Sequence, residues 1–120
     1  MKVNRVQVSN DAVVLKCMLS AYSFQSLLAN SYTPLRDVIK SSGLKSTEVV
    51  DSLRRLTKYS LVTRERHPAG YRLTIRGNAQ ATSNDVEWCL RDLYSFPTFG
   101  AWMEAAIADE IAEQGEPRGE

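Results

Sequence analysis

The chain has 120 residues, of which 43% are hydrophobic and 24% are charged, and its formal net charge is +1. This length and composition suit one compact globular domain and exclude a disordered or low-complexity chain. Two cysteines provide no disulfide framework, and no segment is long and apolar enough for a signal peptide or a membrane span, so we expect a reduced cytoplasmic protein without membrane association.

The first patterned stretch is "VQVSNDAVVLKCMLSAYSFQSLLAN". Its alternating valines predict a short arm or edge strand, and Ser9 or Asn10 can cap a helix over about residues 11–29. That helix is apolar around most of its circumference. We therefore expect it to be buried nearly all round, with a partner subunit helping to cover it.

The segment "YTPLRDVIKSSGL" predicts a short helix. Thr33 suits the N-cap, Pro34 suits the first helical position, and Gly43 suits a left-handed C-cap. A second helix follows at once, with Ser46 as its N-cap. Two helices joined by so short a turn, over about residues 34–60, predict a helix-turn-helix.

Helical spacing divides the second helix into two faces. Val49, Leu53 and Leu56 cluster within about a quarter of the circumference and predict the buried face. The opposite side is polar and basic, with one aliphatic residue on its flank: Thr47, Val50, Asp51, Arg54, Arg55 and Lys58. This helix can therefore dock through one face and present the other.

Two β-prone runs flank the turn signal "HPAG" in "LVTRERHPAGYRLTIRG", which predicts a hairpin over about residues 61–76. The register that pairs Thr63 with Leu73 and Glu65 with Tyr71 collects most apolar residues on one face. It also pairs Leu61 with Ile75, places Gly70 at the bulge of a three-residue loop, and puts Arg64, Arg66 and Arg72 together on the other face.

The rest of the chain predicts a polar linker over residues 77–84 and two more helices, over about 85–94 and 99–113. Asn84 or Ser83 can cap the first of them. The second carries Trp102, Met103, Ala106, Ile107 and Ile111 on one side. Because the terminal helices (11–29 and 84–113) hold more apolar surface than a small core covers, we expect a homodimer joined through them.

Charge is distributed unevenly along the chain. The balance is +2 over residues 1–39 (four Lys/Arg, two Asp/Glu), +6 over 40–76 (nine and three) and −7 over 77–120 (two and nine). A basic segment attracts polyanions, most commonly nucleic acid. The alternative is a solvated surface whose charge the acidic part neutralises.

Two motifs within residues 34–77 resemble those of winged helix-turn-helix domains in bacterial regulators of the MarR and ArsR type. "VVDSLRRLTKYSLVTR" is similar to the V-x-x-x-L-x-x-L-x-x-x-G-L-V-x-R pattern of a recognition helix that enters the wing, and "YRLTIRG" is similar to the Y-x-L-T-x-x-G that closes the wing. The resemblance covers a little over a third of the chain. It implies major-groove positions for Lys45, Ser46, Thr47, Val50, Asp51 and Arg54, and a wing on the DNA backbone or minor groove for Arg64, Arg66, His67 and Arg72.

The sequence departs from this family pattern at two places. Ser60 stands where the pattern has glycine, which we expect to require only a modest backbone adjustment. Val50 and Asp51 stand in the middle of the implied reading face. A carboxylate near phosphates costs affinity unless it accepts a hydrogen bond from a cytosine amino group.

Other chemistry finds little support in the sequence. His67 is the single histidine and has no cysteine pair nearby, Cys17 and Cys89 are far apart, and the glycines are scattered singly. We therefore expect no metal, no cofactor and no enzymatic activity. The aromatic residues of the C-terminal half suit a ligand pocket or, preferably, the core or a dimer seam: Trp88, Phe96, Phe99 and Trp102.

Together these features predict a mainly α fold with a small β-hairpin (α+β). The expected organisation is a winged helix-turn-helix domain over residues 1–82, a C-terminal helical extension for dimerisation over 83–114, and a disordered tail over 115–120. The expected function is a small DNA-binding transcriptional regulator, a homodimeric repressor that reads a near-palindromic site on double-stranded DNA. The alternatives are a winged-helix adaptor that binds another protein, and an architectural or replication-associated DNA binder with little sequence preference.

Overall fold

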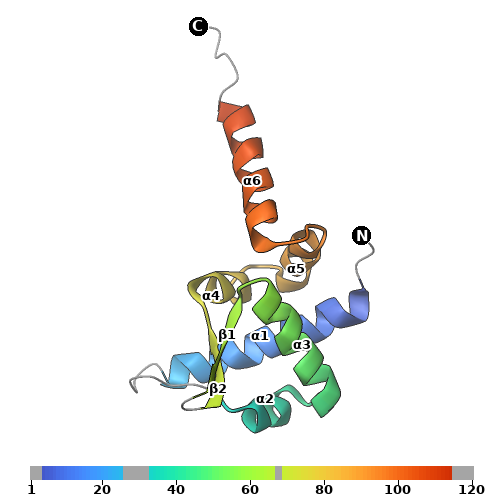
Figure 1. The fold of residues 1–120 in the computed structure, drawn as a ribbon, viewed down its shortest axis with the longest axis vertical. Helices are drawn as coiled ribbons and strands as arrows, with labels where there is room; N and C mark the ends of the chain where they lie inside the picture. Colours follow the sequence, from blue (N-terminus) through green and yellow to red (C-terminus); the bar gives the residue numbers. More distant parts are fainter. Residues whose placement is uncertain (1–3, 26–32, 67–68, 115–120) are drawn as a thin grey trace, which may run out of the picture.

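The structure, a computed structural model, describes residues 4–25, 33–66 and 69–114. These residues form a mainly helical α+β fold with one two-stranded antiparallel hairpin, which confirms the predicted fold class (Figure 1). Within the described ranges, no helix is long and apolar enough to cross a membrane. The elements in chain order are α1 (Arg5–Gln25), α2 (Leu35–Ser42), α3 (Ser46–Lys58), β1 (Val62–Arg66), β2 (Ala69–Leu73), α4 (Ile75–Ala81), α5 (Val86–Tyr94) and α6 (Phe99–Gln114).

Helix α1 begins earlier than its sequence predicts. The Asn4 side-chain oxygen accepts hydrogen bonds from the backbone N–H groups of Val6 (2.9 Å) and Gln7 (3.2 Å), as an N-cap does. The predicted strand at the valines and the predicted caps at Ser9 or Asn10 are therefore wrong. Val8, Ala12 and Leu15 are buried at i, i+4 and i+7, so a helix places Val8 on the same buried face as the residues that follow. The last predicted helical residues, 26–29, lie outside the described part of the chain.

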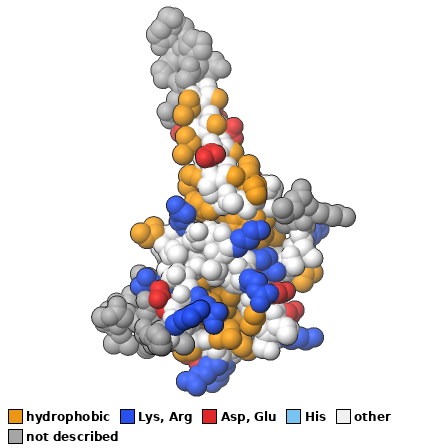
Figure 2. All heavy atoms as spheres, in the orientation of Figure 1, with side chains coloured by type: hydrophobic (Ala, Val, Ile, Leu, Met, Phe, Trp, Pro, Cys, Tyr) orange, Lys and Arg blue, Asp and Glu red, His pale blue; other side chains and the backbone are white. Residues whose placement is uncertain are grey.

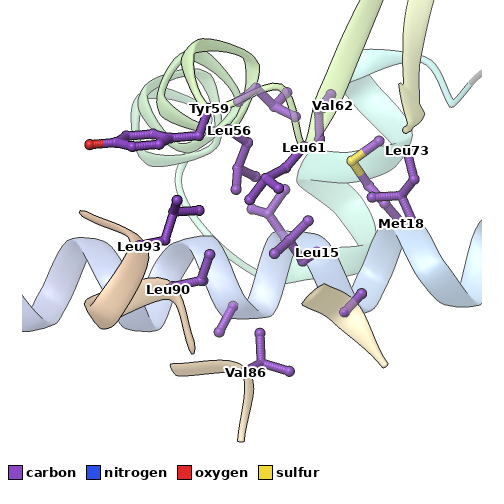
Figure 3. Close-up of a cluster of buried hydrophobic side chains, with 14 of the residues drawn as sticks. Leu15, Met18, Leu56, Tyr59, Leu61, Val62, Leu73, Val86, Leu90 and Leu93 are labelled. Carbon is purple, nitrogen blue, oxygen red and sulfur yellow. The ribbon is translucent and has the colours of Figure 1, made fainter. Parts of the chain in front are cut away.

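One hydrophobic core surrounds α1 (Figure 3). Helix α1 packs against α2, α3, α4, α5 and β2, and these elements bury Val8, Ala12, Val14, Leu15 and Met18 of the helix. The largest fully buried side chains come from α1, α3, the root of the hairpin and α5: Leu15, Met18, Leu53, Leu56, Leu61, Leu90 and Leu93.

The turn between α2 and α3 follows the sequence closely. Gly43 has φ +71°, the predicted left-handed conformation, and its N–H donates to the Ile39 carbonyl (3.3 Å). Both helix starts differ from the prediction by one residue, because Pro34 and Lys45 occupy the N-cap positions in place of Thr33 and Ser46. At the second start, the Lys45 backbone N–H donates to a Glu48 side-chain oxygen at 3.0 Å.

Helix α3 ends in a sharp reversal at Ser60, which has φ +62°. The Leu61 N–H then donates to the Leu56 carbonyl (2.9 Å), and the chain enters β1. The glycine of the resembled pattern would adopt this left-handed conformation freely, whereas a residue with a Cβ does so at a cost of about 1 kcal/mol. The expected modest backbone adjustment is thus a full change of conformational region.

The hairpin register differs by one residue from the predicted register. The observed pairs are Val62 with Leu73, Thr63 with Arg72, Arg64 with Tyr71, Glu65 with Gly70, and Arg66 with Ala69. The prediction assumed that one whole face of the hairpin is buried. On the face that holds Val62 and Leu73, that pair is buried at the root, whereas Arg64 and Arg66 farther along the hairpin are exposed. Arginines and apolar residues can therefore share this face.

The predicted polar linker after the hairpin contains helix α4. The Thr74 hydroxyl caps it by accepting from the Gly77 N–H (3.0 Å), and the same hydroxyl donates to the Ser60 carbonyl (2.6 Å). Ile75, predicted to pair with Leu61 in the sheet, instead begins this helix and is exposed. The last two helices match their predicted positions within one residue, although Asp85 is the N-cap of α5 in place of Ser83 or Asn84.

Candidate nucleic-acid interface

The outer face of α3 is exposed along the whole helix. Val49, Leu53 and Leu56 are buried, as their spacing predicts, and Val50 is half-buried on the flank. The exposed side carries small polar groups at its N-terminal end and charged groups farther along: Lys45, Ser46, Thr47, Asp51, Arg54 and Lys58. The structure thus presents this candidate reading surface to solvent as one continuous face.

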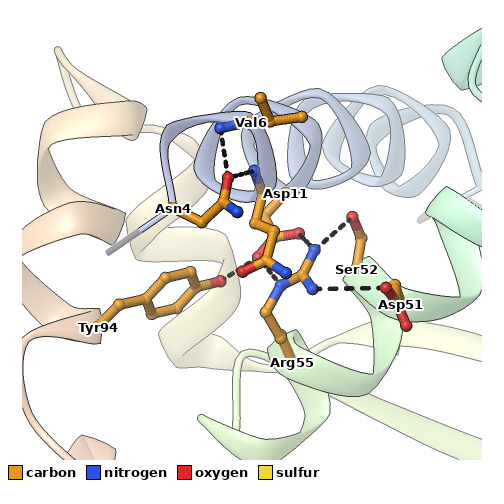
Figure 4. A network of polar contacts seen from close by, with 8 residues as sticks. Asn4, Val6, Asp11, Asp51, Ser52, Arg55 and Tyr94 are labelled. Atoms are coloured by element: carbon orange, nitrogen blue, oxygen red, sulfur yellow. Dashed lines mark hydrogen bonds and ion pairs between the residues drawn. The ribbon is translucent and has the colours of Figure 1, made fainter. Parts of the chain in front are cut away.

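Arg55 does not belong to that face, and its predicted place there is wrong. Its guanidinium turns inward and donates two hydrogen bonds to the buried Asp11 carboxylate, from Nε to Oδ2 and from Nη2 to Oδ1, each at 2.9 Å (Figure 4). The Tyr94 hydroxyl donates to the same Oδ2 at 2.5 Å. A charge without a partner could not remain at this depth, and Asp11 supplies the partner.

Two groups of this network, Arg55 and Tyr94, have shifted pKa values. Partial burial disfavours the Arg55 cation, but the hydrogen bond and charge of Asp11 outweigh burial and raise the pKa of Arg55. Burial, together with the Asp11 charge, raises the pKa of Tyr94 far above its usual value. Tyr94 therefore stays protonated and donates. The network fixes α3 against α1 and α5.

A hollow of about 350 Å³ lies between α3 and the hairpin. Three cations from the two elements line it: Arg54 and Lys58 from α3, and Arg64 from β1. The observed register produces this arrangement, because it places Arg64 and its partner Tyr71 on the side of the hairpin that faces α3. Arg72 pairs with Thr63 and belongs to the other face, so the predicted grouping of Arg72 with Arg64 and Arg66 is wrong.

A second hollow, of about 590 Å³, lies on the other side of Arg64 and Tyr71, between the hairpin and the start of α2. Arg36 and Arg66 line it. The backbone of Tyr71 exchanges two hydrogen bonds with Thr33 (2.8 and 2.9 Å), which fixes the hairpin to the segment before α2. Arg36 and Tyr71 are not among the site residues predicted from the sequence, and only the observed register pairs Tyr71 with Arg64.

Basic side chains gather on the part of the molecule that holds α2, α3 and the hairpin, as Figure 2 shows. Across residues 4–25, 33–66 and 69–114, no ion pair neutralises Arg54, Lys58, Arg64 or Arg66. The exposed Asp51 carboxylate lies 3.9 Å from Arg55 Nη1. His67, a predicted site residue at the hairpin tip, lies outside the described residues.

The described residues contain no group of three or more His, Cys, Asp or Glu side chains arranged to hold a metal ion. What the geometry offers is an exposed helix face beside a hollow with a cationic rim, which can bind a polyanion by charge and by shape. The sequence matches no protein-family model, no curated protein and no solved structure.

Proposed function

We propose that this protein is a DNA-binding transcriptional regulator built as a winged helix-turn-helix, with α3 in the major groove and the hairpin against the DNA backbone. The observation that supports it is the convergence of Arg54, Lys58 and Arg64 on one hollow beside the exposed face of α3. The major groove admits a helix, and cations at the edge of such a helix meet phosphates.

The structure suggests a division of roles within this face. Thr47, Val50 and Arg54 project from α3 toward the proposed groove, where side chains read base edges. Arg64 and Arg66 extend from the hairpin, where contacts with phosphates set affinity but carry no sequence information. We assign Arg55 no DNA contact, because its Nε and Nη2 groups already donate hydrogen bonds to the Asp11 carboxylate.

Val50 and Asp51 favour a second candidate, an adaptor that binds another protein. An aliphatic and an acidic side chain in the middle of the exposed face suit a protein surface better than a row of phosphates. Both candidates use the same face. They differ in whether double-stranded DNA binds at all.

Fluorescence anisotropy with two labelled duplexes, one of arbitrary sequence and one from upstream of the protein's own gene, tests the proposal. The logarithm of the binding constant should fall linearly with the logarithm of the salt concentration. Arg64→Ala should weaken both duplexes alike and lower the salt slope by about one unit. Arg54→Ala should cost about 1–3 kcal/mol on the preferred duplex and little on the other.

Lys16→Ala is the matched control, because Lys16 is an exposed cation on α1, outside α2, α3 and the hairpin. It should bind both duplexes as the unaltered protein does. Absence of salt-dependent binding to either duplex, in a protein shown to be folded by circular dichroism, would contradict DNA binding and favour the adaptor. Salt-dependent binding without preference between duplexes would indicate an architectural DNA binder.

A further inference from the structure

The outer half of α6 is not buried by the described part of its own chain. The start of the helix is held, since Phe99 is buried under the Arg76 guanidinium (4.4 Å to the ring centre) and Trp102 Nε1 donates to Asp92 Oδ2 (2.8 Å). From residue 106 to residue 113 every residue is exposed, and Figure 1 shows α6 projecting from the body. A helical segment as short as residues 106–113 is marginally stable in water without packing.

A row of large apolar side chains runs along this projecting helix. Met103, Ile107 and Ile111 are spaced four residues apart and are 38%, 50% and 63% exposed. Figure 2 shows hydrophobic side chains along the same helix. Contiguous exposed apolar surface of this kind marks a site of contact with another molecule.

The charges of α6 indicate what kind of surface can cover this row. The helix contains no Lys or Arg, and its acidic residues are Glu104, Asp109, Glu110 and Glu113. Helical spacing places Glu104 and Glu110 on the two flanks of the apolar row, so two α6 helices packed on each other through that row would bring like charges together.

A surface of opposite character lies at the base of α6. Trp88 on α5 is 57% exposed, and Arg91, three residues later, is its neighbour on the helix surface. Arg91 and Arg5 of α1 line a common hollow of about 310 Å³ with Val8 and Glu87. Figure 1 places the N-terminal end of α1 beside α5. We call Arg5, Trp88 and Arg91 the basal patch, which offers two guanidinium groups and one large apolar ring.

We propose that two copies of this chain exchange their α6 helices, so that Ile107 and Ile111 of each copy cover Trp88 of the other. The acidic flanks of α6 then lie against the arginines of the basal patch. The exchange is reciprocal, so it forms a closed two-fold dimer that contains the contact twice. Each basal patch is then covered by the α6 helix of the other copy. It does not depend on the proposed DNA binding, because α3 and the hairpin take no part in it.

Sedimentation equilibrium of the full chain at about 0.1 and 0.5 M NaCl tests the exchange. We expect a dimer that weakens as salt rises, because opposite charges meet across the contact. Ile107→Glu and Arg91→Glu should each raise the dimer dissociation constant by at least about tenfold. Ile75→Glu and Lys40→Glu are the matched controls on exposed positions of α4 and α2, and should leave that constant unchanged.

A monomer at about 100 micromolar at both salt concentrations would overturn the proposal. So would a dimer that strengthens with salt and is unaffected by Arg91→Glu, because that result indicates pairing of α6 with α6 between like charges. Circular dichroism of each variant checks that the body is folded. The mutated side chains are exposed, so a loss of dimer with an unchanged spectrum reports the contact itself.

Discussion

Replacement of Gly77 by alanine tests how the hairpin and α4 are joined. Gly77 lies in the first turn of α4, where its backbone is packed against the Leu61 carbonyl. A Cβ at this position would lie well inside van der Waals contact of the Leu61 carbonyl oxygen. It would also lie 2.8 Å from the carbonyl carbon and 3.2 Å from Leu73 Cδ2.

The size of the effect follows from what must move. Two of the colliding atoms belong to the backbone of Leu61, so relief requires separating α4 from the start of the hairpin by more than about 1 Å. That separation breaks hydrogen bonds from the Thr74 N–H to the Leu61 carbonyl (3.1 Å) and from the Thr74 hydroxyl to the Ser60 carbonyl (2.6 Å). The two lost hydrogen bonds cost about 1 kcal/mol each, and overpacking costs about 1–3 kcal/mol more. Alanine stabilises a helix relative to glycine by roughly 1 kcal/mol, which offsets part of this cost. We expect the free energy of unfolding to fall by about 3 kcal/mol in total.

Urea unfolding followed by circular dichroism measures this loss, and Gly100→Ala provides the control. Gly100 lies in the first turn of α6, where an added Cβ would meet only the Thr98 hydroxyl oxygen, at 3.7 Å. The same substitution there should leave stability unchanged or raise it by up to about 1 kcal/mol. Equal effects at the two glycines, or a more stable Gly77→Ala variant, would refute the close contact between α4 and Leu61.

Four further predictions follow from the same structure. Arg55→Met should lower the free energy of unfolding in urea by about 3–5 kcal/mol, because it leaves the Asp11 carboxylate buried without its cation. Arg54→Met, at the exposed neighbouring position, should lower it by less than about 0.5 kcal/mol. Burial and Asp11 raise the pKa of Tyr94 in the folded state. The stability that Tyr94 contributes is therefore complete below the unfolded pKa of about 10 and is lost as pH rises above that value. Tyr94→Phe should flatten the fall in unfolding free energy between about pH 9 and 11. Ser60→Gly should raise the melting temperature, by relieving about 1 kcal/mol of left-handed strain, and a lower melting temperature would show that the serine conformation is not strained. Asp51→Asn should tighten binding to arbitrary duplex DNA several-fold in the anisotropy assay, and unchanged binding would mean that Asp51 does not approach the phosphates.

The two faces of α3 could be predicted from the sequence, because helical spacing alone decides which side chains share a side. Val49, Leu53 and Leu56 had to point together whatever they packed against. Gly43 was also predictable, since the left-handed turn that ends α2 favours glycine locally. The positions of Arg54 and Lys58 in the candidate interface followed from the same spacing.

The features that the sequence did not predict depend on contacts between distant segments. The spacing of Arg55 placed it with the outer residues, but its side chain bonds an acid 44 positions earlier in the chain. The hairpin register was misjudged because the sequence does not reveal how far the strands extend past the core. Helix α4 was missed because it has only seven residues and includes Gly77 and Asn78, which are poor helix formers. The Thr74 hydroxyl that caps it also bonds the preceding turn.

The shape of the hollow between α3 and the hairpin is set by residues that do not line it. Leu61 joins the two elements: its N–H bonds the last turn of α3, and its carbonyl accepts from Thr74 and faces Gly77. The Asp11 carboxylate holds Arg55 and therefore fixes α3 on its opposite side. A change at Gly77 should consequently move Arg64 relative to Arg54 without altering either side chain. Weaker DNA binding by a folded Gly77→Ala variant would then report geometry, whereas the loss in Arg64→Ala reports charge, and only the second should change the salt slope.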